Sequence, residues 1–179
     1  MQKLKFLKPA LVLLIITVGV ALLLAVVNYI TYDKIILNEQ IKRENAIKEL
    51  FPSLESFEEI TTDDAPGCVT GIGKVVGDQN SHLGYFVEVT PVGFKDVISL
   101  IVALDKNGCV LDVVCMSTSE TPGVGTKATQ DSYFSSFTQK NSENVSDVDT
   151  ITGATISSKA VKHGIEDACR AVSALTEVK

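Results

Sequence analysis

The sequence has 179 residues, enough for one modest domain with additional segments, and 45% of them are hydrophobic, which suffices to fill a core. The formal net charge is −6, and because the first 30 residues hold three lysines and no acidic residue, the remainder carries −9. A chain this acidic is not expected to bind nucleic acid, nor to adhere to anionic lipid through a charged surface patch.

An uncharged apolar segment runs from Ala10 to Ile30 and consists almost wholly of Leu, Ile, Val and Ala. At ~1.5 Å per residue, a helix of this length measures about 31 Å, the thickness of the hydrocarbon core of a bilayer. A cleaved signal peptide is the competing interpretation, but it would have a shorter apolar core of roughly 7–15 residues and a small-x-small cleavage site. We therefore expect a transmembrane helix over residues 10–30.

The flanking charge predicts the orientation of this helix. Three lysines precede it, at Lys3, Lys5 and Lys8. By the positive-inside rule, residues 1–9 are then expected in the cytoplasm and the rest of the chain outside the cell membrane. Residues 31–52 stay compatible with a helix until Pro52 ends it. Apolar residues among charges in this segment indicate a solvated helical stalk whose apolar edge lies against the domain.

Between Cys68 and Met116 the hydrophobic pattern becomes that of β-strands separated by Gly, Pro, Asn and Asp. The predicted strands are Val69–Val76, Leu83–Thr90, Val97–Leu104 and Cys109–Met116. The last two are joined by a tight turn whose Asn107-Gly108 pair suits positive φ, so they are expected to form an antiparallel hairpin. The near-continuous apolar run of the third strand predicts burial on both faces of the sheet.

The C-terminal segment has the periodicity of an amphipathic helix. Its apolar residues recur three to four positions apart and form one stripe: Val161, Ile165, Ala168, Cys169, Val172 and Leu175. The helix should begin near Thr155 to Ser158 and cover one side of the sheet. The sequence thus predicts an α+β fold for residues 53–179, with an antiparallel sheet packed with helices.

The cysteines and histidines do not form a recognisable metal or nucleophile motif. Cys68, Cys109, Cys115 and Cys169 include no Cys-x-x-Cys pair, so the usual spacing for zinc or iron–sulfur ligation is missing. Cys109 and Cys115 lie about 20 Å apart on one predicted strand and cannot form a disulfide, whereas other pairings stay open. Cys169 faces the apolar stripe and should be a buried thiol. Since both histidines are isolated, hydrolytic chemistry is not expected.

The first candidate site is the stretch that leads into the last helix, Asp149-Thr150-Ile151-Thr152-Gly153-Ala154-Thr155. The start of a helix leaves backbone N–H groups unpaired and carries a partial positive charge. Hydroxyl groups there, on Thr155, Ser157 and Ser158, together with a flanking glycine make a site suited to phosphate. The alternative is that a Thr or Ser in this stretch only caps the helix.

The second candidate site is the loop after the hairpin, Glu120-Thr121-Pro122-Gly123-Val124-Gly125, followed by Lys127. Its Gly125-Thr126-Lys127 does not have the residue order of a nucleotide-binding P-loop, which requires Gly-Lys-Ser/Thr. Considered alone, the Pro-Gly pair would predict a surface turn.

The first stretch resembles the flavinylation motif Asp-x-x-Ser/Thr-Gly-Ala-Thr of the FMN-binding domain family. The second is similar to that family's Glu-Thr-Pro-Gly-Leu-Gly signature, with Val124 as a mild departure. A further departure is Gly93-Phe94-Lys95-Asp96, where the family often has more glycine. The family includes the G subunit of the Rnf complex and the C subunit of the Na⁺-translocating NADH:quinone oxidoreductase.

The resemblance implies FMN held at Thr155 through a phosphodiester, which a separate flavin transferase makes from FAD. It implies that cofactor-binding residues surround that linkage, namely Asp149, Thr152, Gly153, Ala154, Ser157 and Ser158. It also implies that the second signature lies against the isoalloxazine through Glu120, Thr121, Pro122, Gly123 and Gly125. Lys127 would either place a positive charge near the flavin or be solvated.

The resemblance implies a membrane-anchored electron-transfer subunit that is not an enzyme on its own. Its partners would be other membrane subunits of an assembly that passes electrons from ferredoxin to NAD⁺ and moves Na⁺ or H⁺. The short link between anchor and domain favours the Rnf complex over the quinone-reducing complex. Two further alternatives are a stand-alone extracytoplasmic flavoprotein and a membrane-tethered interaction module without flavin, in which Thr155 only caps the helix.

Overall fold

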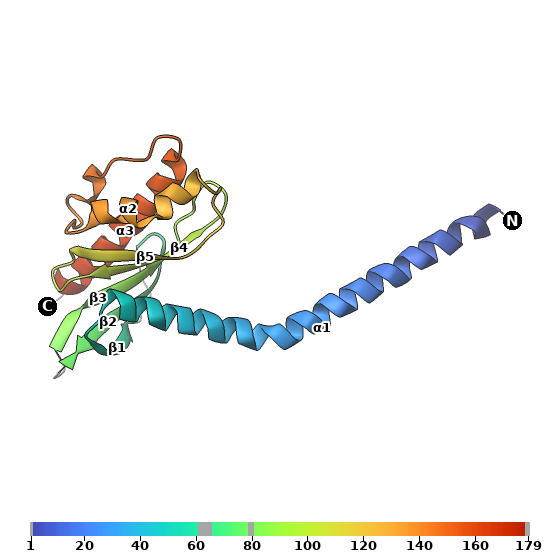
Figure 1. Ribbon diagram of the computed structural model, residues 1–179, viewed down its shortest axis with the longest axis horizontal. Coiled ribbons are helices and arrows are strands. Elements are labelled where there is room, and N and C mark those ends of the chain that lie inside the picture. The colour runs from blue at the N-terminus through green and yellow to red at the C-terminus, as the bar shows by residue number, and fades with distance from the viewer. Residues whose placement is uncertain (1, 61–65, 79–80, 178–179) are drawn as a thin grey trace. The chain divides into compact units, whose positions relative to one another are not determined.

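The computed structural model describes residues 2–60, 66–78 and 81–177 (Figure 1). The chain forms two compact units, Met1–Lys42 and Arg43–Lys179. Helix α1 (Gln2–Leu50) begins in the first unit and contributes its last turns to the second.

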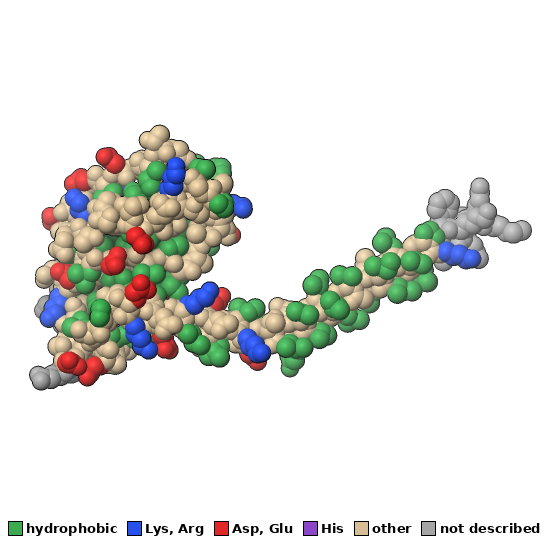
Figure 2. Space-filling model, in the orientation of Figure 1, with side chains coloured by type: hydrophobic (Ala, Val, Ile, Leu, Met, Phe, Trp, Pro, Cys, Tyr) green, Lys and Arg blue, Asp and Glu red, His purple; other side chains and the backbone are tan. Residues whose placement is uncertain are grey.

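The first unit is helical throughout its described residues. Among the described residues, one helical segment, Lys8–Leu50, is long and apolar enough to cross a membrane, and no residue of its most apolar window is buried within the protein. Figure 2 shows hydrophobic side chains along this helix. An exposed apolar surface of this extent is stable against lipid rather than against water, which agrees with the apolar segment recognised in the sequence.

The second unit is built on a five-stranded antiparallel sheet in which each strand pairs with its neighbour in sequence. The strands are β1 (Leu54–Ile60), β2 (Val69–Gly77), β3 (Ser81–Val89), β4 (Ile98–Leu104) and β5 (Val110–Thr118). The last four correspond to the predicted strands, and the predicted α+β class is confirmed. Strand β1 was not predicted, because its pairing register shifts between Leu54 and Ser56 and its burial does not alternate every second residue.

Both faces of the sheet are buried, as the apolar run in β4 predicts. On one face, helix α3 (Thr155–Glu177) packs through a core that includes Val87, Leu100, Val102, Ile165 and Val172. On the other face lie the end of α1 and the residue after it, through Ala46, Ile47, Leu50 and Phe51. The sheet therefore lies between α3 and the last turns of α1 (Figure 1).

The predicted β4–β5 hairpin is present, with one correction to its turn. The Asp105 N–H donates to the Cys109 carbonyl at 2.8 Å, and Gly108 has a φ of +79°. Among the described non-glycine residues only Gln139 has positive φ, so Asn107 does not share this conformation. The loop is therefore the three-residue type in which a single glycine follows the turn, and only that glycine needs the left-handed region.

Short helical segments connect β5 to α3. They are η2 (Gly125–Thr129), α2 (Asp131–Phe134), η3 (Ser135–Phe137) and η4 (Val145–Asp147). Their buried side chains, among them Phe134, Phe137 and Val145, extend the core on the α3 side of the sheet. This packing fixes the position of both candidate stretches. The stretch Asp149–Thr155 leads directly into α3, and the stretch Glu120–Gly125 leads directly into η2.

All four cysteines are free thiols in this structure. Cys169 is fully buried, as its place on the apolar stripe predicts, and burial raises the pKa of its thiol to about 12. A thiol in this state is inert at neutral pH.

Candidate functional site

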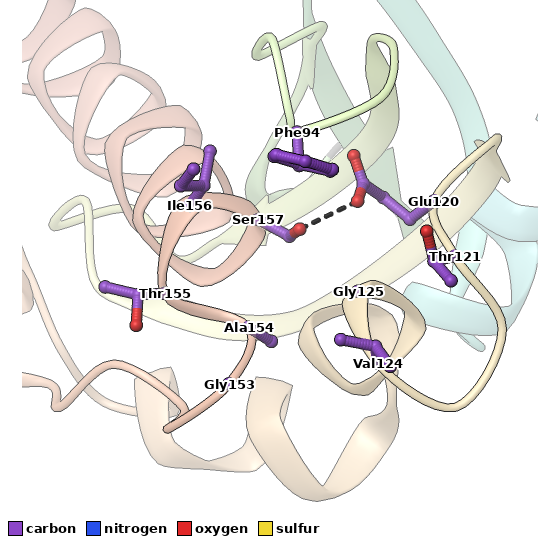
Figure 3. Close-up of a pocket in the computed structure, with 10 residues that line it drawn as sticks. All are labelled: Phe94, Glu120, Thr121, Val124, Gly125, Gly153, Ala154, Thr155, Ile156 and Ser157. Atoms are coloured by element: carbon purple, nitrogen blue, oxygen red, sulfur yellow. Dashed lines mark hydrogen bonds between the residues drawn. The ribbon is translucent and has the colours of Figure 1, made fainter.

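A cavity of about 400 Å³ lies where the loop before β4, the loop after β5 and the start of α3 meet. It is lined by Phe94, Glu120, Thr121, Val124, Gly125, Gly153, Ala154, Thr155, Ile156 and Ser157. Figure 3 shows Thr155 and Ile156 of the helix start on one side and Thr121 and Val124 on the other. The fold thus brings together the two stretches that the sequence singles out.

The loop after β5 enters the cavity through a tight turn. The Val124 N–H donates to the Thr121 carbonyl at 3.1 Å, and the two central residues are Pro122 and Gly123. Gly123 has a φ of +75°, as the third residue of a type II turn requires, while proline supplies the φ of the second. A Cβ at Gly123 would meet nothing within 4 Å, so this position demands glycine for its backbone angle rather than for close packing.

The stretch before α3 repeats this arrangement. The Ala154 N–H donates to the Ile151 carbonyl at 3.0 Å, and Gly153, third in the turn, has a φ of +83°. A Cβ at Gly153 would also meet nothing within 4 Å, so open space borders the turn. The turn ends where α3 begins, and it places Ala154 and Thr155 at the cavity wall.

Thr155 is the first residue of α3. Ala154 accepts the Ser158 N–H at 2.9 Å, so Ala154 is the N-cap residue, and its side chain has no acceptor for the first N–H groups of the helix. Thr155 is exposed, and within the described part of the chain its hydroxyl makes no hydrogen bond. The helix start therefore offers uncapped N–H groups and a free hydroxyl beside the cavity.

Ser158 supports the motif from behind the cavity. Its buried hydroxyl accepts the Ile151 N–H at 3.1 Å and donates to the Ala154 carbonyl at 2.9 Å. The Tyr133 hydroxyl donates to the Ser158 carbonyl at 3.3 Å. The two bonds of the Ser158 hydroxyl connect both ends of the Ile151–Ala154 turn to the first turn of α3. Ser158 therefore stabilises the shape of the site without lining the cavity.

Glu120 connects the three segments of the cavity. Its Oε1 accepts the Lys95 N–H at 3.0 Å, and its Oε2 accepts the Ser157 hydroxyl at 2.8 Å. Burial opposes ionisation, but the bonds from the Lys95 backbone and Ser157, joined by the backbone of Phe94 and Asp96, hold the pKa of Glu120 below its ordinary value. The carboxylate is therefore ionised at neutral pH.

Two glycines allow this carboxylate to sit so close to the backbone. A Cβ at Gly125 would lie 2.4 Å from the Glu120 Oε2, and one at Gly93 would lie 2.3 Å from its Oε1. Both contacts are shorter than any real Cβ contact, and the oxygens cannot move away without losing their bonds. Gly125 is thus required for close packing, unlike Gly123 and Gly153.

The remaining predicted site residues lie outside the cavity lining. Asp149, Thr152, Pro122, Gly123 and Lys127 are not among the lining residues, and Ser158 is buried behind the wall. The Asp149 carboxylate makes no hydrogen bond with the described residues, so an Asx-type bond does not shape the turn.

Three apolar side chains of the cavity were not predicted as cofactor contacts, although Val124 belongs to the second candidate site and Phe94 to the Gly93–Asp96 stretch. Phe94, Val124 and Ile156 line it although they are 68%, 48% and 55% exposed. In the described part of the second unit, all exposed large hydrophobic side chains belong to these three residues or to Val92 and Val97, in the loop that carries Phe94. An apolar wall of this kind beside uncapped N–H groups fits a flat aromatic ligand that carries a phosphate.

Comparison with known proteins agrees with this chemistry. Residues 93–170 match the model of the FMN-binding domain, and this range includes every residue that lines the cavity. The chain is 30% identical over 177 residues to the G subunit of the ion-translocating oxidoreductase complex of Methanosarcina acetivorans, a match that covers 93% of this chain and 94% of that protein.

Other relatives belong to the same kind of complex. The G subunit of the Na⁺-translocating ferredoxin:NAD⁺ oxidoreductase complex of Acetobacterium woodii is 27% identical, with 88% of this chain and 87% of that protein covered. The G subunit of the proton-translocating ferredoxin:NAD⁺ oxidoreductase complex of Clostridium ljungdahlii is 34% identical over 54% of this chain and 57% of that protein. The crystal structure of Shewanella oneidensis NqrC shares the fold, with a TM-score of 0.51 at 17% identity over 72% of this chain and 74% of that one.

Proposed function

The chain belongs to the FMN-binding domain family, as a relative of the G subunits of ion-translocating oxidoreductase complexes, and from this membership we propose its function. The chain is the electron-transfer subunit of an Rnf-type complex, with FMN covalently bound at Thr155. In this role it passes electrons between neighbouring subunits on their way from ferredoxin to NAD⁺, and it is not an enzyme on its own. The observation that carries the proposal is the free Thr155 hydroxyl at an uncapped helix start beside an apolar cavity.

The start of α3 suits a phosphodiester. The unpaired N–H groups of the first helical turn and the positive end of the helix dipole favour the remaining negative charge. In the linking reaction, the Thr155 oxygen bonds to the phosphorus of the FMN half of FAD, the bond between the two FAD phosphates breaks, AMP leaves and the hydroxyl proton is lost. A flavin transferase supplies the catalysis. Asp149 and Thr152, which lie outside the cavity lining, are available for that enzyme to recognise.

The cavity suits the isoalloxazine ring. Phe94, Val124 and Ile156 supply apolar contact, and Thr121 and the wall around Gly125 complete the lining. The flavin, once bound, supplies one-electron and two-electron transfer, while the protein positions and tunes it. The Pro122-Gly123 turn shapes the loop, and Lys127 stays outside the lining.

The proposed placement follows from the apolar helix. Residues 10–30 span the cell membrane, the lysines before them stay in the cytoplasm, and the stalk and the domain from about residue 53 are extracytoplasmic. A covalent link is useful in this position because a flavin that dissociated outside the cell would be lost by dilution. The match to an Rnf-type G subunit covers 94% of that protein and supports a role in an Rnf-type complex. The likeness to NqrC supports only the fold, so it gives less support to membership of the quinone-reducing complex.

The role is tested in membranes of the source organism. Replacing the chromosomal copy by Thr155→Val should leave the amount of assembled complex unchanged and abolish ferredoxin-dependent NAD⁺ reduction. Thr150→Val, a matched change in the variable part of the motif, should keep both. Undiminished electron transfer in the Thr155→Val membranes would show that the linkage is not part of the electron path.

A further inference from the structure

Glu120 is the one buried charged side chain among the described residues, with 4% of its surface exposed. Acidic residues are rarely buried unless they are paired with a cation. In the described part of the chain no Lys, Arg or His forms a salt bridge with Glu120, and the side chain of its neighbour Lys95 is exposed. The carboxylate is stabilised by hydrogen bonds, and no cationic side chain of the described residues neutralises its charge.

The position of this charge is fixed. The bonds from the Lys95 N–H and the Ser157 hydroxyl hold both carboxylate oxygens, which lie close against Gly93 and Gly125. Figure 3 shows the carboxylate at the cavity, joined to Ser157 of α3. A group bound in the cavity therefore lies beside a permanent negative charge in a partly desolvated place.

A purely structural role does not require this charge. A glutamine at position 120 would accept the Lys95 N–H through its amide oxygen and donate to the Ser157 oxygen through its amide nitrogen. It would make both connections without the desolvation cost of an ion. The presence of a carboxylate in place of an amide therefore needs a reason beyond holding the three segments together.

We propose that Glu120 is a redox-tuning residue, whose fixed negative charge at the cavity wall lowers the reduction potential of the flavin held there. The inference rests on the proposed function. Reduction adds negative charge to the ring system, and a nearby anion at low effective dielectric opposes that addition. A low potential suits a carrier that receives electrons originating from a strong reductant and must pass them on.

The test compares Glu120→Gln with wild type, both full-length and co-expressed with a flavin transferase. Glu120→Gln should be flavinylated to the wild-type extent by intact mass. In a redox titration at pH 7, its ratio of reduced to oxidised flavin at a fixed ambient potential should be at least about tenfold higher than that of wild type. Asp96→Asn, which removes an exposed carboxylate from the adjacent loop, should change this ratio less than about twofold.

A flavinylated Glu120→Gln protein with the wild-type ratio overturns the tuning role and leaves the proposed function intact. Absence of flavin from the wild type itself would instead refute the proposed function and this inference with it.

A reciprocal measurement needs no variant. If the charge on Glu120 lowers the potential, reduction must raise the pKa of its carboxyl by the same free energy. Redox-difference infrared spectroscopy of the wild-type holoprotein, titrated with pH, should therefore give a higher carboxyl pKa in the reduced than in the oxidised state. An identical pKa in both states overturns the proposal, even where Glu120→Gln fails to fold.

Discussion

Replacing Ser157 by alanine tests how the cavity wall is held together. The Ser157 hydroxyl donates to the Glu120 carboxylate at 2.8 Å, and the two side chains are 2% and 4% exposed. A hydrogen bond to a charged group contributes about 1.5–3 kcal/mol, and water cannot easily replace it at this depth. At roughly 3–5 °C per kcal/mol for a domain of this size, the melting temperature should fall by about 5–15 °C.

The assay is thermal unfolding of the full-length chain in detergent at pH 7, followed by circular dichroism. Ser135→Ala is the matched control, because its exposed hydroxyl donates only to the Ser132 carbonyl at 3.1 Å within a short helix. That change should cost less than about 0.5 kcal/mol. The double variant Ser157→Ala with Glu120→Ala, in which each single change removes the bond, should show a coupling free energy of about 1 kcal/mol or more.

Two results would refute this reasoning. One is a melting temperature for Ser157→Ala within a degree or so of that for Ser135→Ala. The other is strict additivity in the double variant, since it would mean that the two side chains do not stabilise each other in solution.

Three further changes test other parts of the account by the same melting assay. The fold lowers the pKa of Glu120 below its ordinary 4.5, so the stabilising contribution of the carboxylate is complete above 4.5 and is lost as pH falls through the lowered pKa. The melting temperature of wild type should therefore fall relative to that of Glu120→Gln as the pH is lowered below 4.5, and parallel curves for the two proteins would contradict this. Gly153→Ala should lower the free energy of unfolding by about 1–2 kcal/mol because the φ of Gly153 is +83°, and Gly153→Asn should lower it less because Asn adopts positive φ more readily. Equal losses for the two variants would argue against a backbone cause. Ile47→Ala should lower the free energy of unfolding by about 2–5 kcal/mol because Ile47 is fully buried, whereas Ile41→Ala, at an exposed position, should lower it little. Similar losses for both variants would mean that the end of α1 is not part of the core.

The elements with strong periodicity were predictable from the sequence. The stripe from Val161 to Leu175 identified α3, and its start was predicted correctly because hydroxylated residues and glycine precede the periodic part. The Asn-Gly turn identified the β4–β5 hairpin. Strand β1 escaped prediction because an edge strand with a register shift loses the two-residue alternation on which such predictions depend.

The site was predictable only where short motifs exist. The two signatures contain Glu120, Thr121, Gly125, Gly153, Ala154 and Thr155, all of which line the cavity. Ser157, which was named for its hydroxyl at the helix start, lines it too. Phe94 was not predicted, because an aromatic residue in a loop has no spacing that distinguishes a cavity wall from an ordinary exposed position. The central place of Glu120 was also hidden, since it depends on contacts with Gly93 and Ser157, which lie 27 and 37 residues away in the sequence.

The most direct test of the central claim is the intact mass of the full-length chain after co-expression with an active flavin transferase. Wild type and Thr150→Val should each gain the mass of one FMN less one water, and their denatured bands should fluoresce under ultraviolet light. Thr155→Val should keep the unmodified mass and show no fluorescence. Flavin retained by Thr155→Val, or absent from wild type while the transferase modifies another substrate, would contradict covalent attachment at Thr155.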